Sequence, residues 1–427
     1  MNAAIIFFIL AALMLTGMPV SIALGLTVLS FLFGFTDVPL ESVALKLFTG
    51  IEKFEIMAIP FFILAGNFLT HGGVARRMIN FATAMVGHWY GGLGLGGVMA
   101  CALFAAVSGS SPATVVAIGS ILLPAMVKAG FPKRFGAGVI TTSGALGILI
   151  PPSIVMVMYA VATNTSVGAL FMAGVIPGIV LAMVLGGVTW WRARKNNYPR
   201  LPKASWSERW KAFRESVWGL FLIVVVMGGI YAGIFTPTEA AAMSAVYAFF
   251  VAVFIYKDMG LKDVPKVLLN SANMSAMLLY IITNAALFSF IMTNENIPQA
   301  MADWIMGHGL GVVSFLLAVN VILLLAGNFM EPSSIMLIFA PILFPIAMKL
   351  GIDPIHLGIL MVVNMEVGMC HPPVGLNLYV ASGITKMGIT ELTVAVWPWL
   401  LAMLGFLAAV TYWPPMSLWL PRMLGMM

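Results

Sequence analysis

The sequence is poor in charge and in cysteine. Only 8% of its 427 residues are charged, against roughly 25% in soluble domains, while 61% are hydrophobic. Its two cysteines, Cys101 and Cys370, both lie in apolar runs, so no disulfide framework is implied. No polar stretch is long enough to fold a soluble domain, and no G-x-x-x-x-G-K-[ST] loop occurs, which argues against ATP hydrolysis. The composition therefore predicts a polytopic protein of the lipid bilayer.

The excess of basic residues does not indicate a nucleic-acid partner. The formal net charge is +6, but Lys and Arg collect in loops that flank apolar segments. With the N-terminus outside, nearly all of them fall on the inner face, as the positive-inside rule favours. Those that remain outside are Lys46, Lys53, Lys349 and Arg422. The apolar start, MNAAIIFFILAALML, has no basic n-region and no small-residue cleavage site, so we interpret it as a retained first span.

One stretch of the chain occurs twice. Residues 121–130 read ILLPAMVKAG and residues 342–351 read ILFPIAMKLG, with Ile, Leu, Pro, Lys and Gly shared in register. The register continues without a gap into further glycines and prolines: Gly147 with Gly368, and Pro151-Pro152 with Pro372-Pro373. A chance match of this length is improbable, so the sequence indicates an internal duplication.

Apolar segments of spanning length follow the same plan in both halves. In the first half they are 2–16, 19–36, 53–71, an amphipathic piece at 74–88, a broken run at 91–129, a broken span at 133–163, and 168–191. In the second half they are 216–234, 238–256, 271–293, an amphipathic piece at 296–307, a broken run at 311–350, a broken span at 354–383, and 392–414. The predicted units are residues 1–191, a basic cytoplasmic linker at 192–215, expected to contain a surface helix, and residues 216–427.

The two broken runs, 91–129 and 311–350, are interpreted as re-entrant helical hairpins. Irregular backbone at membrane depth persists only inside protein or beside a water-filled cavity. Two full spans for each run is the alternative. With five full spans per half, the second half is inverted relative to the first. The predicted fold is an all-α polytopic membrane protein with two inverted-topology repeats, about ten transmembrane helices and two re-entrant hairpins, as in elevator-type ion transporters.

Small polar residues occupy both hairpin tips. The second arms start at Pro112 and Pro332, where proline suits the first helical turn, so their N–H groups are expected to face the midplane and favour anions. The tip hydroxyls belong to Ser108, Ser110, Ser111, Ser333 and Ser334. The alternative is that these serines only cap the arms.

The breaks in spans 133–163 and 354–383 offer the complementary chemistry. Glycine and proline in SGALGILIPPS, which begins at Ser143, leave carbonyl groups without intrahelical partners, a donor set suited to Na⁺. The equivalent run from Gly368 contains His371 and is followed by Asn377. The alternative is a pair of proline kinks that only shape packing.

Ionisable residues inside the membrane are functional candidates. Glu331 lies at the second tip, and Glu366 and His371 lie in the second broken span. Glu239 is assigned to structure instead, because Thr236-Pro237-Thr238-Glu239 fits a helix capping box.

With these residues identified, the chain resembles the large membrane subunit of tripartite ATP-independent periplasmic (TRAP) transporters of the C4-dicarboxylate type. The resemblance covers essentially the whole chain. Its most specific motifs are GMPVSIALG at 17–25, IPFFILAGNFL at 59–69, SGSSPATVVAIGSILLPAMVKAG at 108–130, SGALGILIPPS at 143–153, GIFTPTEAAA at 233–242 and HPPVGLNLYVASGIT at 371–385.

The resemblance implies Na⁺-driven import of a small organic acid across the bacterial inner membrane by an elevator movement. The distribution of basic residues predicts that both termini are periplasmic. It also implies two partners, a periplasmic substrate-binding protein and a small four-helix membrane subunit. One sodium site would use Ser108, Gly147, Ile150 and Pro152. A second would use Gly327, Gly368, His371 and Pro373. The family pattern more often has threonine where His371 stands, and imidazole is a poor Na⁺ ligand, so His371 offers only its backbone or serves the substrate.

The residues together predict a substrate-translocating subunit, not an enzyme. A membrane enzyme needs an acidic metal cluster or a nucleophile with a base, and no such spacing occurs. Candidates for substrate contact are Ser110, Ser111, Ser143, Glu331, His371 and Asn377. We expect His371 to donate a hydrogen bond to a substrate carboxylate. The alternative function is a stand-alone H⁺- or Na⁺-coupled symporter or antiporter on the same scaffold.

Overall fold

The computed structural model describes residues 2–36, 38–309, 311–328, 330–372 and 375–427, which form helices and connecting turns without a strand. The first half contains α1 (Asn2–Leu15), α2 (Val20–Phe35), α3 (Leu40–Thr49), η1 (Phe54–Met57), α4 (Ala58–His71), α5 (Val74–Val86), α6 (Gly92–Ser108), α7 (Ser111–Lys128), α8 (Lys133–Ser143), η2 (Gly144–Ile148), α9 (Ile154–Thr163) and α10 (Val167–Lys195).

The second half contains α11 (Trp206–Tyr231), α12 (Pro237–Phe250), η3 (Val251–Ile255), α13 (Val264–Asn294), α14 (Ile297–Gly307), α15 (Val312–Gly327), α16 (Pro332–Lys349), α17 (Pro354–Cys370), α18 (Leu376–Thr385), α19 (Ile389–Tyr412) and α20 (Pro415–Met423). Both broken runs and both broken spans are interrupted where the sequence predicts. Two short helices, α3 and α20, were not predicted, because neither is long enough to read as a span.

Helix starts follow local capping chemistry. At α12, the Thr236 hydroxyl accepts from the Glu239 N–H and the Glu239 carboxylate accepts from the Thr236 N–H, which confirms the capping-box interpretation. The same box, Ser205 with Glu208, starts α11. The helix predicted in the linker is present, but the boundary expected between it and the span at 216–234 is not. No glycine or proline follows Ser205 before the apolar run, so α11 continues unbroken from linker to membrane segment.

Eight helices within the described ranges are long and apolar enough to cross a membrane. They include α7 and α16, the second arms of the two broken runs, whereas α1, α2, α6, α15 and α17 are shorter apolar helices. The chain is therefore a multi-helix membrane protein. The number of full spans and the re-entrant path of the two runs stay predictions.

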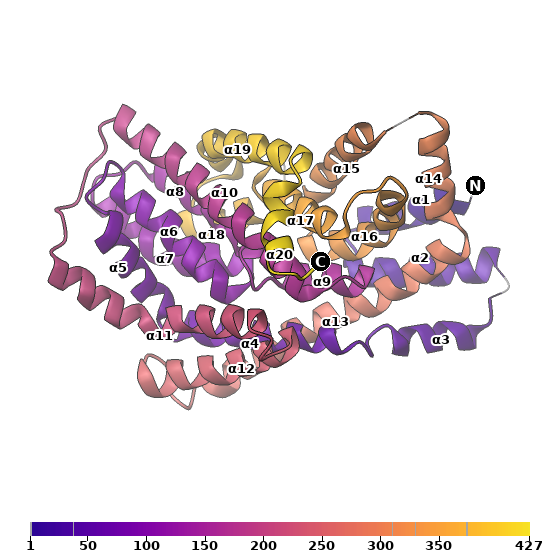
Figure 1. The fold of residues 1–427 in the computed structure, drawn as a ribbon, viewed down its shortest axis with the longest axis horizontal. Helices are drawn as coiled ribbons and strands as arrows, with labels where there is room; N and C mark the ends of the chain where they lie inside the picture. The colour runs from indigo at the N-terminus through magenta and orange to yellow at the C-terminus, as the bar shows by residue number, and fades with distance from the viewer. Residues whose placement is uncertain (1, 37, 310, 329, 373–374) are drawn as a thin grey trace.

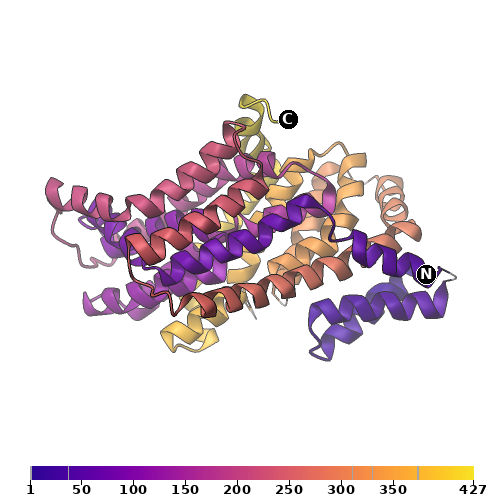
Figure 2. The ribbon, with the colours of Figure 1, turned by 90° about the horizontal axis from the view of Figure 1, so that it is seen from below.

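Two groups of helices lie side by side (Figure 1). One is a row in which α12 packs on α4, and α13 packs on α2, α3 and α4. In the other, α6 and α7 pack on α8 and η2, while α15 and α16 pack on α17. In Figure 2 the row runs across the molecule, with α1 and α2 at one end. Each broken run thus lies against a broken span.

The ion pairs join residues predicted to lie on the same side of the membrane. Arg76 and Arg77 both contact Asp258, and Arg134 contacts Glu391 at 2.8 Å, on the predicted inner face. On the predicted outer face, Lys349 contacts Asp303 at 3.0 Å. The packing is consistent with the predicted sidedness, which stays a prediction.

Candidate functional site

The first tip, the turn between α6 and α7, is held by its own hydroxyl groups. Gly109 adopts a left-handed conformation with φ of 60° and reverses the chain. The Ser108 hydroxyl lies 2.9 Å from the Thr114 hydroxyl, and the Thr114 hydroxyl donates to the Ser110 carbonyl at 2.8 Å. These contacts do not cap α7, whose N-cap residue Ser110 makes no side-chain capping hydrogen bond, so the structure does not show the capping role stated as the alternative.

The first tip touches the backbone of the first broken span. A Cβ atom on Gly147 would lie 2.5 Å from the Ser110 carbonyl oxygen and 2.7 Å from the Ser111 nitrogen. A Cβ atom on Gly109 would lie 2.9 Å from the Pro152 carbonyl oxygen. Only glycine permits these approaches, so main-chain polar groups of the tip and of the break converge in one buried place.

Of the four residues predicted for the first sodium site, the structure brings Ser108, Gly147 and Pro152 together around this contact. Ile150 is in the same break, but its side chain points away and packs on Gly178 of α10. Only the main chain of Ile150 is therefore available to the tip.

A polar contact also joins the two halves of the chain. The Asn377 side-chain amide, at the start of α18, donates to the Ser111 hydroxyl at 2.8 Å. The same amide lies 3.4 Å from the Thr141 carbonyl and 3.8 Å from the Cys370 sulfur. Ser111 and Asn377, both predicted for substrate contact, thus lie together although they are far apart in sequence. Thr141 and Cys370 were missed, because both lie in apolar runs.

The second tip, Asn328 to Ser334, lies between α15 and α16. A Cβ atom on Gly327 would lie 3.0 Å from the Gly368 Cα, so α15 and α17 touch main chain to main chain. His371 Nδ1 lies 3.0 Å from Asn328 Oδ1. Gly327, Gly368 and His371 are therefore close together, as predicted, and Pro373 lies outside the described residues. Asn328 was missed, although a polar residue directly after Gly327 was a usable signal.

Several buried polar atoms around the two breaks have no hydrogen-bond partner within the described part of the chain. They are Ser143 Oγ, Glu331 Oε1, Ser334 Oγ, Asn364 Oδ1 and both carboxylate oxygens of Glu366. Buried polar atoms are almost always paired, so unpaired ones mark places where an ion, water or ligand belongs. Glu366 is fully buried, and its carboxyl group needs either a proton or a cation beside it.

The available donors suit a hard ion rather than a transition metal. Among the described residues no three His, Cys, Asp or Glu side chains lie close enough to hold a metal. The first tip instead offers hydroxyl and carbonyl oxygens, and the second adds one carboxyl group and one imidazole. Hydroxyl and carbonyl oxygens are ligands for Na⁺.

The fold and the site together define a membrane transporter: paired discontinuous helices bring polar groups into an apolar helical core. The family model for the "Tripartite ATP-independent periplasmic transporter, DctM component" matches residues 7–416. The chain therefore belongs to the DctM family of TRAP transporter components, which confirms the resemblance seen in the sequence.

Individual relatives agree over the full length. The chain is 76% identical to the C4-dicarboxylate TRAP transporter large permease protein DctM of Rhodobacter capsulatus, with 100% of both chains covered. It is 55% identical to the protein of the same name from Pseudomonas aeruginosa, with 95% of each covered. The solved YdaH transporter of Alcanivorax borkumensis matches with a TM-score of 0.61 over 88% of each chain at 14% identity, which shows a shared fold alone. These proteins are transporters and permeases.

Proposed function

We propose that this chain is the translocating subunit of a Na⁺-coupled TRAP transporter that imports C4-dicarboxylates across the bacterial inner membrane. The observation that carries the proposal is the main-chain contact of each tip with a broken helix, at Gly147 and at Gly327. The names of the two DctM relatives support the dicarboxylate substrate.

The two contacts are the proposed sodium sites. Ser108, Gly147, Ile150 and Pro152 supply the first, with carbonyl groups as the main ligands. Gly327, Gly368, the main chain of His371 and Pro373 supply the second. The unpaired oxygens of Ser334 and Glu331, at the start of α16, support cation binding at the second tip.

The substrate lies between the tips in this proposal. Ser110, Ser111, Ser143 and Asn377 offer hydroxyl and amide donors from one side, and His371 donates from the other. If the Nδ1–H group of neutral His371 donates to Asn328, the Nε2 atom of His371 has a lone pair and no proton. His371 can then donate a hydrogen bond from Nε2 to a carboxylate only as the imidazolium. Glu331 contributes through the Na⁺ that accompanies the dianion.

The chain consists of two inverted repeats, residues 1–191 and 216–427, joined by the linker at 192–215. Transport proceeds by an elevator movement in which part of each repeat moves against a fixed scaffold. The hairpins and broken helices move with α10 against a scaffold that includes α1, α2, α11 and α12. The small four-helix subunit packs on the membrane face of α11 and α12 in this proposal, where large apolar side chains such as Trp218, Phe221 and Phe250 are exposed to lipid or to a partner. A periplasmic binding protein delivers the substrate.

The movement is tested by a disulfide between α10 and α11. A Cβ atom on Gly168 would lie 3.6 Å from Ile230 Cγ2, so Gly168→Cys with Ile230→Cys places two thiols in bonding range. Oxidation should stop uptake, and reduction should restore it. Full uptake in the cross-linked protein would show that the two groups do not move apart.

The coupling ion is tested with the complex reconstituted in liposomes. Uptake of labelled succinate should require an inward Na⁺ gradient and should stop when choline replaces Na⁺. The second candidate function, H⁺ coupling, is favoured by the buried unpaired carboxyl group of Glu366. Uptake that persists in choline and follows a pH gradient would support that candidate and refute the sodium sites.

A further inference from the structure

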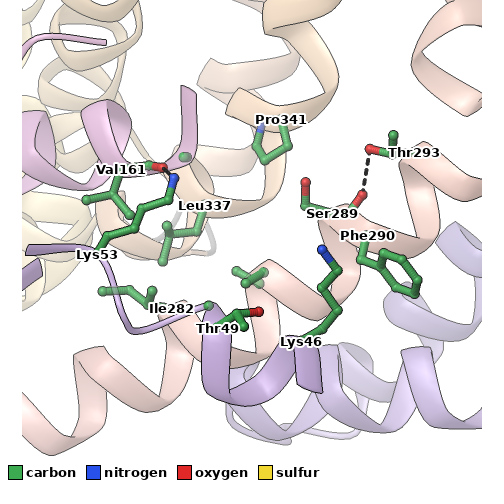
Figure 3. Close-up of a pocket in the computed structure, with 14 residues that line it drawn as sticks. Lys46, Thr49, Lys53, Val161, Ile282, Ser289, Phe290, Thr293, Leu337 and Pro341 are labelled. Atoms are coloured by element: carbon green, nitrogen blue, oxygen red, sulfur yellow. Dashed lines mark hydrogen bonds between the residues drawn. The ribbon is translucent and has the colours of Figure 1, made fainter. Parts of the chain in front are cut away.

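A separate cavity lies outside the two tips, between α3 and α13 on one side and α9 and α16 on the other. It has a volume of about 340 Å³ and is lined by residues of α3, α9, α13 and α16 together with Lys53. This is the lower end of the range of roughly 300–1,000 Å³ typical of small-molecule sites. Figure 3 shows Lys46 and Lys53 entering it from two sides, with Ser289 and Pro341 facing the same space. We call it the lysine cleft.

The lysine cleft is positively charged. Its fourteen described lining residues include Lys46 and Lys53 and no acidic residue. Lys53 Nζ donates to the Val161 carbonyl at 2.5 Å and to Asn164 Oδ1 at 2.7 Å, which holds its ammonium group at the C-terminal end of α9. The Lys46 ammonium group lies 5.2 Å from the Phe290 ring centre. Neither lysine has an ion pair within the described residues.

Two cations in one partly enclosed cleft favour a bound anion. Lys46 is exposed and Lys53 is half-buried, so both can meet an anion that enters the cleft from water, and their summed positive potential attracts it. Thr49 and Thr293 hydroxyls bond back to carbonyls of their own helices at 2.9 Å, so the lysines are the main recognition groups. A ligand with two carboxylates matches two ammonium groups.

The lysine cleft also leads toward the second tip. Leu337 and Pro341 line it from α16, and Leu337 lies one helical turn beyond Ser333 and Ser334. An anion in the cleft would contact α16 on one side and α13 on the other. Lys46 and Lys53 are also among the few basic residues predicted to lie outside.

We propose that the lysine cleft captures the dicarboxylate dianion between Lys46 and Lys53 before it reaches the tips. The direction of passage rests on the proposed function, but the binding event does not. The cleft is thus a site for small dicarboxylates in addition to the site between the broken helices.

Protection of an engineered thiol tests the capture site directly. Thr49→Cys places a thiol in the lysine cleft, while Cys101 and Cys370 are fully buried and should stay unlabelled. In the purified complex in neutral detergent without Na⁺, succinate should slow labelling by a negatively charged methanethiosulfonate about fivefold or more. Acetate should protect less. Adding Lys46→Gln and Lys53→Gln should abolish protection, whereas adding Lys349→Gln, which removes an ion pair elsewhere on the same predicted face, should preserve it.

Other outcomes overturn the proposal. Succinate without effect, or with equal protection in the double glutamine background, excludes capture by the two lysines. Protection by phosphatidylglycerol that succinate cannot displace identifies a lipid phosphate as the occupant. Protection only by the periplasmic binding protein identifies a protein interface. If uptake is driven by Na⁺ but succinate does not protect the thiol, the capture site is refuted and the proposed function is not. If succinate protects the thiol but uptake is not driven by Na⁺, the proposed function is refuted and the capture site is not.

Discussion

The two tips each precede one copy of the repeated stretch, at 121–130 and at 342–351, yet they differ in how firmly they are held. The first tip has an internal hydroxyl network, a main-chain contact at Gly147 and a hydrogen bond from Asn377 to Ser111. In the described part of the second tip, His371 contacts Asn328 and the Glu331 carboxyl group lies beside Ser333 and Ser334, while Glu331 Oε1 and Ser334 Oγ remain buried without a well-formed hydrogen bond.

The difference indicates that the two tips have different roles in binding. Groups already paired within the protein form a pre-organised site that changes little when a ligand binds. Unpaired buried groups are stabilised only when a ligand arrives, so the second tip is expected to respond most to ion and substrate. The following predictions test this comparison, from the largest expected effect to the smallest.

Replacing Gly147 or Gly327 with alanine should show the difference between the two tips most clearly. Gly147→Ala puts a methyl group 2.5 Å from a carbonyl oxygen, whereas Gly327→Ala puts one 3.0 Å from a Cα. We expect Gly147→Ala to abolish uptake and to lower stability by about 1–3 kcal/mol, with a smaller loss for Gly327→Ala. Thermal unfolding and succinate uptake measure both effects.

The control for these variants is Gly187→Ala, whose added methyl group would meet no atom within 4 Å. It should leave uptake unchanged and, as alanine favours helix, should not lower stability. Equal losses at Gly147 and Gly327 would contradict the difference between the tips.

Asn377→Leu should break the link between the halves. The change leaves the Ser111 hydroxyl and the Thr141 carbonyl buried without this donor, at a cost of about 1–3 kcal/mol, so uptake should fall roughly tenfold. Ser120→Ala removes an exposed hydroxyl from the same helix α7 and should have little effect. Uptake by Asn377→Leu at the level of Ser120→Ala would show that the link is dispensable.

His371→Thr restores the more common family residue and should weaken dicarboxylate uptake several-fold while keeping Na⁺ dependence. His371→Gln should retain more uptake than His371→Leu, since glutamine is still a donor. If the threonine variant matches the wild type at every pH, His371 only packs against Asn328.

The smallest expected effect concerns Lys53. Burial lowers its pKa, while nearby Glu55 partly opposes the shift. As pH rises through this lowered pKa, Lys53 loses its charge and succinate protection of Thr49→Cys should weaken, with Lys46 left as the other cation. Lys53→Arg, which keeps its charge, should retain protection over the same pH range. A parallel decline in both proteins would exclude titration of Lys53 as the cause.

The sequence was most informative where composition and helix-breaking residues act on their own segment of the chain. The hydropathy pattern, Pro112, Pro332 and the glycine–proline runs located both broken runs and both broken spans to within a few residues, since these features act on their own segment. The continuous α11 was mispredicted because a change from polar to apolar composition was taken for a helix boundary.

Contacts between distant segments were beyond the sequence. The link from Asn377 to Ser111, Thr141 and Cys370 depends on how α18 packs on α7 and α8. The pairing of Lys46 with Lys53 in one cleft depends on α3, a helix too short to be predicted. Family resemblance proposed Ser108, Gly147 and Pro152 as a set, and the packing gives the reason that glycine is required among them.

The most direct test of two sodium sites, one at each tip, is simultaneous measurement of ²²Na⁺ and labelled succinate entry into proteoliposomes that contain the complex. Each site is expected to carry its own ion, so at least two Na⁺ should enter with each succinate. Entry of succinate with one Na⁺ would leave a single coupled site, and entry with none would contradict the account.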